Sequence, residues 1–203
     1  MPRLISDEER ERTRQAIISH TVQIIITKKG IRNITVDDIV RSASVSKSAF
    51  YSYFKTKEEC LYEVFKGTIV EQIRQADLIL QESLPLKETA IKFLHEVYLA
   101  ENSINHFFDH TDLEVLFRKL PPEYSEKEQM IKGGGIVAYV MESLGFDETQ
   151  GLTFTMLLAC INFVATFHSN PNRVKEETIE CLVLAIADYI DKNGKRNEQK
   201  QIK

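Results

Sequence analysis

Between residues 46 and 57 the sequence concentrates hydroxyl and basic side chains, the groups that hydrogen-bond to phosphate and neutralise its charge. Phe50 and Phe54 are four residues apart, so they share one face of a helix, and we expect that face to be buried. The other side chains of this helix are small, basic or hydroxylated, which suits contact with a nucleic-acid duplex. The positions predicted to make that contact are Thr35, Ser46, Lys47, Ser48, Ala49, Tyr51, Ser52, Tyr53 and Lys57.

Two short helices must position these side chains. Thr35 and Asp38 have the spacing of a capping box, which predicts a helix from about residue 35 to residue 43. The segment 44–46 interrupts it, and Ser46 can cap a second helix over about residues 47–54 through its hydroxyl. Ser48 and Ala49 are small enough for that helix to enter a major groove. The layout predicts a helix-turn-helix over about residues 35–54, and the alternative is a helical hairpin with a polar face.

A longer helix is expected to precede this motif. Ser6 and Glu9 have capping-box spacing, and cations followed by Gly30 are typical of a helix end. Apolar residues in the i, i+4, i+7, i+8 pattern predict that one side of this helix is buried. Three of its basic residues either reach nucleic acid or form a solvated charged face, namely Arg10, Arg12 and Arg14.

The segment from Thr35 to Leu61 resembles the DNA-binding domain of TetR/AcrR-family transcriptional regulators. The matching positions extend over some fifty residues, preceded by a helix that ends in Lys-Gly. They are Thr35, Asp38, Ile39, Val40, Ala43, Val45, Ser46, Lys47, Ser48, Phe50, Tyr51, Tyr53, Phe54, Lys57, Glu58 and Leu61. Where the family has glycine in the turn, this chain has Ser44, and a left-handed backbone is less favourable for serine than for glycine. The turn geometry is therefore left open.

The resemblance implies a domain organisation and a function. The DNA-binding domain would cover residues 10–66, and an effector-binding and dimerisation domain would cover residues 67–193. A homodimer would bind double-stranded DNA at a palindromic operator and act as a repressor released by a small, largely apolar effector. A shift of the helix at residues 57–82 would change the separation of the two recognition helices. The alternative is an all-α ligand-binding, protein-binding or architectural DNA-binding module without effector control.

Composition limits the class of protein. Residues 1–66 contain 12 Lys and Arg against 9 Asp and Glu, whereas the whole chain of 203 residues has a net charge of −4. The basic excess at one end fits binding of a polyanion there. The three cysteines are far apart without a CxxC motif, and neither a signal peptide nor a run of about 18 apolar residues is found, so we expect a cytoplasmic protein without a membrane span. No catalytic or cofactor motif appears, which predicts no enzyme activity and no cofactor.

Beyond residue 66 the periodicity predicts only helices, about nine in the whole all-α chain, and a disordered tail at residues 194–203. Aromatic and flexible side chains that either line an effector pocket or belong to an ordinary core, together with one glycine, are Phe93, Val97, Phe107, Phe108, Phe117, Met130, Gly134, Tyr139, Phe163 and Phe167. The glycines at 133–135 indicate either a simple helix break or space for close packing or a ligand.

The two last long helices are more apolar than a surface pair requires, which predicts a symmetric four-helix interface between two copies, with internal packing as the alternative. Its expected residues are Leu152, Met156, Cys160, Phe163, Ile179, Leu182 and Ile186. His106, His110 and Glu114 share a helical face and form a weak candidate metal site, although an exposed polar face is the preferred interpretation.

Overall fold

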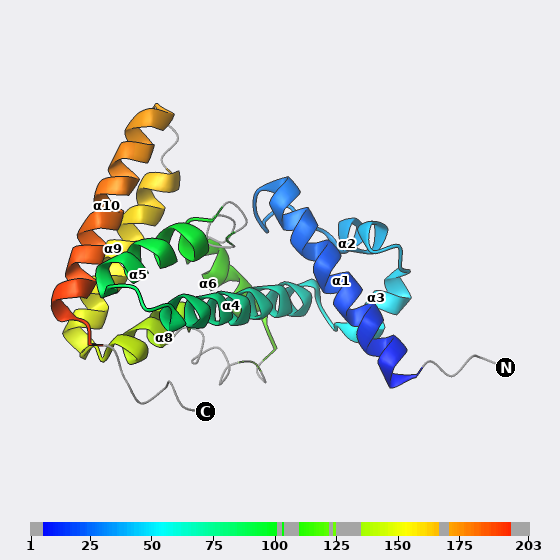
Figure 1. Cartoon of the computed structure of the whole chain (residues 1–203). Coiled ribbons are helices and arrows are strands. Elements are labelled where there is room, and N and C mark those ends of the chain that lie inside the picture. The colour runs from blue at the N-terminus through cyan, green and yellow to red at the C-terminus, as the bar shows by residue number, and fades with distance from the viewer. Residues whose placement is uncertain are drawn as a thin grey trace. The chain divides into compact units, whose positions relative to one another are not determined.

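The computed structural model describes residues 6–100, 103, 110–121, 124, 135–166 and 171–195. Within these ranges the chain has nine α-helices, one π-helical turn and no strand, so the all-α prediction is confirmed (Figure 1). The helices pack into two compact units. Unit 1 contains Met1–Thr68 and Phe107–Ser125, and unit 2 contains Ile69–His106 and Glu126–Lys203.

Unit 1 begins with α1 (Asp7–Lys28). The Ser6 hydroxyl accepts a hydrogen bond from the amide of Glu9 at 3.1 Å, and the Glu9 carboxylate accepts one from the amide of Ser6 at 3.2 Å. These two bonds form the predicted capping box. The helix ends where Lys29 takes a left-handed conformation with φ 52°, one residue before Gly30.

Three further helices of unit 1 enclose its core together with α1. They are α2 (Val36–Ser42), α3 (Lys47–Tyr53) and the first part of α4 (Lys57–Gln81). The α1 helix packs on α2, and α2 packs on α3. Their buried side chains form one apolar cluster, which explains why such short helices are stable, since isolated helices of this length are not. Its members include Ile17, Ile25, Ile34, Ile39, Phe50, Phe54 and Leu61.

The α6 helix (His110–Lys119) also belongs to unit 1. The Phe117 ring lies 6.4 Å from the ring of Tyr62 and 6.1 Å from the ring of Phe65, both edge to face. Arg32 Nε is 2.5 Å from Asp112 Oδ1 at the other end of the helix. Phe117 was predicted to line an effector pocket. In the described structure its aromatic partners are Tyr62 and Phe65 of α4 within unit 1, and its place in a pocket stays a prediction.

Unit 2 is a bundle made by the rest of α4, α5 (Leu86–Phe93), the π-helical turn η1 (Leu94–Tyr98), α8 (Gly135–Leu144), α9 (Glu148–Thr166) and α10 (Asn172–Asn193). The α10 helix packs on both α9 and α5, as Figure 1 shows in orange, yellow and green. Gly151 allows a close approach of α9 to α8, because a Cβ at this position would collide with the side chain of Met141. The core between the helices includes Leu94, Phe154, Leu158, Ile161, Val183, Ile186 and Ala187.

Beyond residue 66 only helices were expected, but the chain widens into the π-helical turn η1 after Phe93. This turn ends with the amide of Leu99 donating to the carbonyl of Leu94 at 2.8 Å. The buried hydroxyl of Tyr98 accepts a hydrogen bond from Asn162 Nδ2 at 2.9 Å, and burial raises the pKa of Tyr98 to about 12. A polar pair thus connects η1 to α9 inside the bundle.

Several predicted features fall wholly or partly outside the described residues. They include the glycines at 133 and 134 and the tail from residue 196 onward. Gly135 is described and begins α8 with φ +42°. In the parts of the chain that the structure describes, none of the helices combines the length and the apolar character needed to cross a bilayer.

Candidate nucleic-acid interface

The start of α2 is held by a network around Asp38. The Thr35 hydroxyl accepts from the amide of Asp38 at 3.2 Å and donates to Asp38 Oδ2 at 2.7 Å. Lys28 Nζ, at the end of α1, donates to the same carboxylate oxygen at 2.7 Å. The Lys28 hydrogen bond, followed by the bonds from Thr35, holds the pKa of Asp38 well below its usual range. The predicted capping box therefore also joins α1 to α2.

The turn between α2 and α3 resolves the question that Ser44 raised. Ser44 has φ 54°, the left-handed conformation that favours glycine. The amide of Ser44 donates to the carbonyl of Arg41 at 3.4 Å, and the amide of Val45 donates to the carbonyl of Val40 at 3.0 Å. These two bonds are those of a Schellman motif, which ends a helix at a left-handed residue. Serine thus takes the place and the conformation expected of the family's glycine.

The α3 helix presents its polar face because two aromatic side chains fix the opposite face. Phe50 and Phe54 are 0% and 2% exposed, and their rings lie 5.5 Å apart. Ser46 caps the helix, its hydroxyl accepting from the amide of Ala49 at 3.1 Å. Tyr51 points outward with 53% of its surface exposed. The side chains of Lys47, Ser48 and Ser52 are exposed, and those of Ala49 and Tyr53 are partly buried.

Two of the predicted DNA-contacting lysines have partners within the protein. Lys47 Nζ is 2.8 Å from Asp37 Oδ1, and this hydrogen bond raises the pKa of Lys47. Both side chains are more than half exposed, so a phosphate can replace the carboxylate at little cost. Lys57 Nζ instead donates to the backbone carbonyl of Ile34 at 2.8 Å in a partly buried position. Lys57 therefore fastens the start of α4 to the residue that precedes Thr35.

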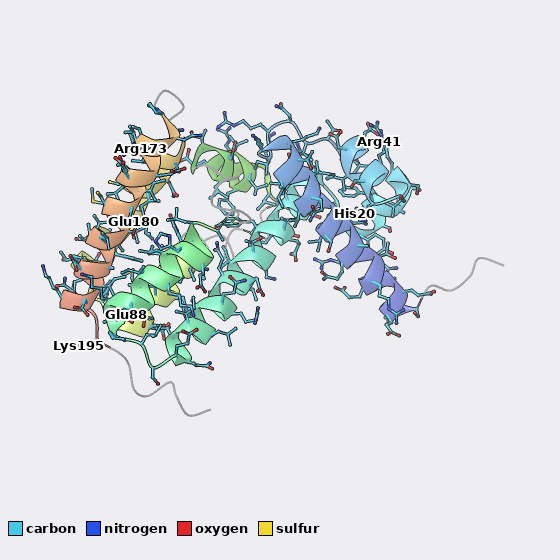
Figure 2. The ribbon with its side chains drawn as sticks, turned by 45° about the horizontal axis from the view of Figure 1, so that its top comes forward. His20, Arg41, Glu88, Arg173, Glu180 and Lys195 are labelled. Carbon is cyan, nitrogen blue, oxygen red and sulfur yellow. The ribbon has the colours of Figure 1, made fainter. Side chains whose placement is uncertain are left out.

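Two exposed arginines of unit 1 are absent from the list of predicted contacts. Sequence reasoning left Arg10 open between a nucleic-acid contact and a solvated face, and it did not consider Arg41. Arg41 lies on α2, near His20 of α1, whose Nδ1 is 3.3 Å from the hydroxyl of Ser42 (Figure 2). The guanidinium of Arg10 lies over the ring of Tyr53, 5.8 Å from its centroid. Only the fold shows that Arg10, more than forty residues away in the chain, is beside the last residue of α3.

The residues predicted for an effector pocket do not form one site in the described structure. Phe93 and Val97 are buried in the core of unit 2, and Phe163 is 65% exposed, so it lines no interior space. The hydroxyl of Tyr139 donates a hydrogen bond to Asp77. Burial, followed by this hydrogen bond, raises the pKa of Tyr139 to about 12. The other predicted pocket residues lie outside the described part of the chain, namely Phe107, Phe108, Met130, Gly134 and Phe167.

Unit 2 does contain a small apolar cavity of about 30 Å³, bounded by α4, α5, α8 and α10. Phe93 lines it, and so does Ser143, whose hydroxyl has no hydrogen-bond partner among the described residues. That volume holds about one water molecule, whereas small-molecule sites span about 300–1,000 Å³. The conformation described here has no space for an effector at this point.

The residues predicted for a dimer interface divide into two groups. Leu152, Met156 and Phe163 are 61%, 71% and 65% exposed, and Cys160 beside them on α9 is also exposed. Ile179 and Leu182 are partly buried and pack on the core of unit 2. Ile186 is 0% exposed within that core, so its prediction as an interface residue is wrong for this structure, because α10 turns this side toward its own bundle.

The weak metal candidate cannot be assembled from the described residues. Glu114 lies on α6, whereas His106 and the side chain of His110 are outside the part that the structure describes. Among the described residues, no cluster of three or more His, Cys, Asp or Glu side chains has an arrangement suited to a metal ion.

Comparison with known proteins agrees with this geometry. Residues 17–64 match the family described as bacterial regulatory proteins, tetR family. The chain is 30% identical over 84 residues, 41% of its length and 44% of the relative, to the "Uncharacterized HTH-type transcriptional regulator YhgD" of Bacillus subtilis (strain 168). It is 28% identical over 102 residues, 46% of its length and 54% of the relative, to the "HTH-type dhaKLM operon transcriptional activator DhaS" of Lactococcus lactis subsp. lactis (strain IL1403).

The matches to these two curated relatives span about half of their length. Both relatives are named transcriptional regulators. The matched residues 17–64 contain most of α1, the whole of α2 and α3, and the start of α4. Residues 17–64 thus match the tetR family, and the helix-turn-helix geometry of the same segment agrees with that match.

Proposed function

We propose that the protein is a sequence-specific DNA-binding transcriptional regulator. The observation that carries the proposal is the exposed face of α3, where hydroxyl, basic and small side chains stand opposite two buried phenylalanines. Anchoring by Phe50 and Phe54 keeps this face rigid. The free amides at the start of α3 and the hydroxyl of Tyr51 can bind phosphate, and the small Ser48 and Ala49 allow close approach to base edges.

Binding as a homodimer to a palindromic operator is the second part of the proposal. The exposed apolar side chains of α9 recur every three or four residues, so they form one stripe along the helix: Leu152, Met156, Cys160 and Phe163. A contiguous apolar stripe on a soluble protein is typical of an interface. A second copy supports a two-fold arrangement, because two α3 helices then meet two half-sites about one DNA turn apart.

Regulation by an effector is the third part. Unit 2 is apolar inside, which suits a small, largely apolar ligand, but its described cavity of about 30 Å³ is too small. Effector binding therefore requires the surrounding helices to separate, or uses space bounded by residues outside the described part. The bound state would have to favour one separation of the two α3 helices, a coupling of about 1–3 kcal/mol.

We propose repression, released by the effector, as the direction of control. Activation is the competing candidate, because the relative DhaS is named an activator. A reporter driven by the recovered operator decides between the two. Repression predicts that deleting the regulator raises expression, and activation predicts that deletion lowers it.

The experiment that tests DNA binding is selection of bound duplexes from a random library with the purified protein. We expect an enriched palindrome with half-sites about 10 base pairs apart. Tyr51→Ala and Lys47→Ala should each lose binding to it while the oligomeric state is kept. Full affinity in both variants would refute the docking of α3, and absence of any enriched site would favour an architectural role without sequence preference.

The dimer is tested separately by Met156→Lys, which places two charges against the same interface across the two-fold axis. We expect sedimentation to show a monomer for this variant and a dimer for the wild type. Gln81→Lys, an exposed substitution on α4 that adds the same charge, is the matched control and should remain dimeric. A dimer that survives Met156→Lys would place the interface elsewhere.

A further inference from the structure

Three arginines occur at alternate positions near the start of α1, and the structure separates their roles. Arg12 Nη2 is 2.5 Å from Glu8 Oε1 on the helix surface. Arg14 Nη2 is 2.8 Å from Glu63 Oε2 on α4, and its guanidinium lies over the ring of Phe54. In the part of the chain that the structure describes, Arg10 makes no ion pair. Of the three, only Arg10 lies beside α3 without a carboxylate partner among the described residues.

The position of Arg10 connects α1 to the recognition helix. Its guanidinium lies 5.8 Å from the centroid of the Tyr53 ring, a cation–π arrangement that leaves the guanidinium edge free to donate hydrogen bonds. Tyr53 is the last residue of α3, and Ser52 precedes it on the exposed face of that helix. The stack therefore puts a positive charge at the end of the surface that α3 presents.

An open cleft lies between the two helices at this point, with a volume of about 300 Å³. Its lining residues are Asp7, Arg10, Glu11, Arg14, Ser52 and Tyr53. The carboxylates of Asp7 and Glu11 would repel an anion in this cleft. The charge of Glu11 is partly offset, because its carboxylate accepts a hydrogen bond from Gln15 Nε2 at 2.7 Å and lies 3.7 Å from Arg14 Nη1. Asp7 lies in the first turn of α1, where the helix dipole offsets its charge. The charge available at the mouth of the cleft is that of Arg10.

We propose that Arg10 binds a phosphate of the operator, so that α1 supplies a DNA contact outside the helix-turn-helix. The inference rests on the proposed DNA-binding function and adds a residue to it. A duplex that receives α3 in its major groove brings its backbone past both ends of that helix. The Arg10 guanidinium and the Tyr53 hydroxyl then face the same strand at the C-terminal end of α3. The contact is to the backbone, so it strengthens binding without reading sequence.

The test compares Arg10→Gln with Arg10→Lys on the operator recovered by selection. Affinity is measured by fluorescence anisotropy from 50 to 300 mM salt. Each neutralised phosphate contributes about 0.9 to the slope of log affinity against log salt. Arg10→Gln should lower the magnitude of the slope by about 0.9 per protomer, or about 1.8 for the dimer, and Arg10→Lys should keep it. Arg12→Gln is the matched control and should behave as the wild type, since Arg12 does not line the cleft beside α3.

The outcomes separate the inference from the function on which it rests. An unchanged slope in Arg10→Gln overturns the inference even if affinity falls, because a residue that only orients Tyr53 changes affinity without changing counterion release. Wild-type protein that binds no duplex would instead refute the proposed function. Circular dichroism and thermal unfolding of each variant confirm that the fold is retained.

Discussion

Replacing Lys57 by methionine should lower the free energy of unfolding by about 1 kcal/mol. A hydrogen bond to a charged group is worth about 1.5–3 kcal/mol, and the partial exposure of Lys57 allows water to replace part of it. Lys57 Nζ donates to the carbonyl of Ile34 at 2.8 Å, and Ile34 is 1% exposed. The substitution therefore leaves this carbonyl without its lysine partner at a buried residue. Methionine keeps the apolar stem, which isolates the loss of the ammonium.

Urea unfolding at one fixed protein concentration measures the effect, because dimer stability depends on concentration. Lys66→Met is the matched control on the same helix. Lys66 is exposed and has no hydrogen bond or ion pair among the described residues, so its replacement should change stability by less than about 0.5 kcal/mol. Salt dependence of operator binding is measured on both variants.

The reasoning is refuted if Lys57→Met unfolds at the wild-type urea concentration and the slope of binding against salt falls by about 0.9 per protomer. Lys57 would then bind phosphate, as the sequence suggested, and its bond to Ile34 would contribute nothing. A lower stability with an unchanged slope supports the structural role. If both the stability and the salt slope fall, Lys57 Nζ binds the carbonyl of Ile34 in the free protein and a phosphate in the complex.

Three further changes test the local structure of unit 1. Asp38→Asn should remove a stabilising contribution that is complete above the unfolded pKa of Asp38 and is lost as pH falls from there through the lower folded pKa. Urea unfolding at pH 3 and pH 6 should therefore show a smaller difference in the variant than in the wild type. Ser44→Gly should raise the free energy of unfolding by up to about 1 kcal/mol, because φ 54° strains a residue with a Cβ, and a lower urea midpoint would contradict this. Phe50→Ala should cost about 3–5 kcal/mol in urea unfolding, whereas Tyr51→Phe should leave stability unchanged and weaken operator binding; equal stability of the two variants would mean that Phe50 does not anchor α3.

The helices of unit 1 could be predicted because their signals are local. The capping boxes at Ser6 and Thr35 require only a partner three residues away, and both occur in the structure. The pair Phe50 and Phe54 identified the buried face of α3 from spacing alone, and both are buried. Local chemistry therefore predicted which side of the recognition helix faces outward.

What could not be predicted depends on residues far apart in the chain. Nothing near Phe117 indicates that its aromatic partners are Tyr62 and Phe65, so an aromatic side chain in the second half of the chain was assigned to a pocket. The π-helical turn at Leu94–Tyr98 was missed because an apolar run with helical spacing is compatible with either type of helix. Ile186 belongs to an apolar stripe with helical spacing, as the exposed apolar residues of α9 do. Only the packing of α10 in unit 2 shows that Ile186 is buried.

The sequence also could not show which cations form ion pairs within the protein, and these pairs affect how DNA binding should be explained. Residues 1–66 have an excess of three cations, which suggested attraction of a polyanion. The structure pairs five of these cations with carboxylates: Arg12, Arg14, Lys28, Arg32 and Lys47. Arg10, Lys29, Arg41 and Lys66 are exposed and have no ion pair within the described ranges. The five paired cations bind phosphate only in exchange for a carboxylate of the protein, so they contribute less to affinity than unpaired cations would. Operator affinity should depend less on counterion release than the composition suggests, and more on the hydroxyls of α3 and its fit in the groove.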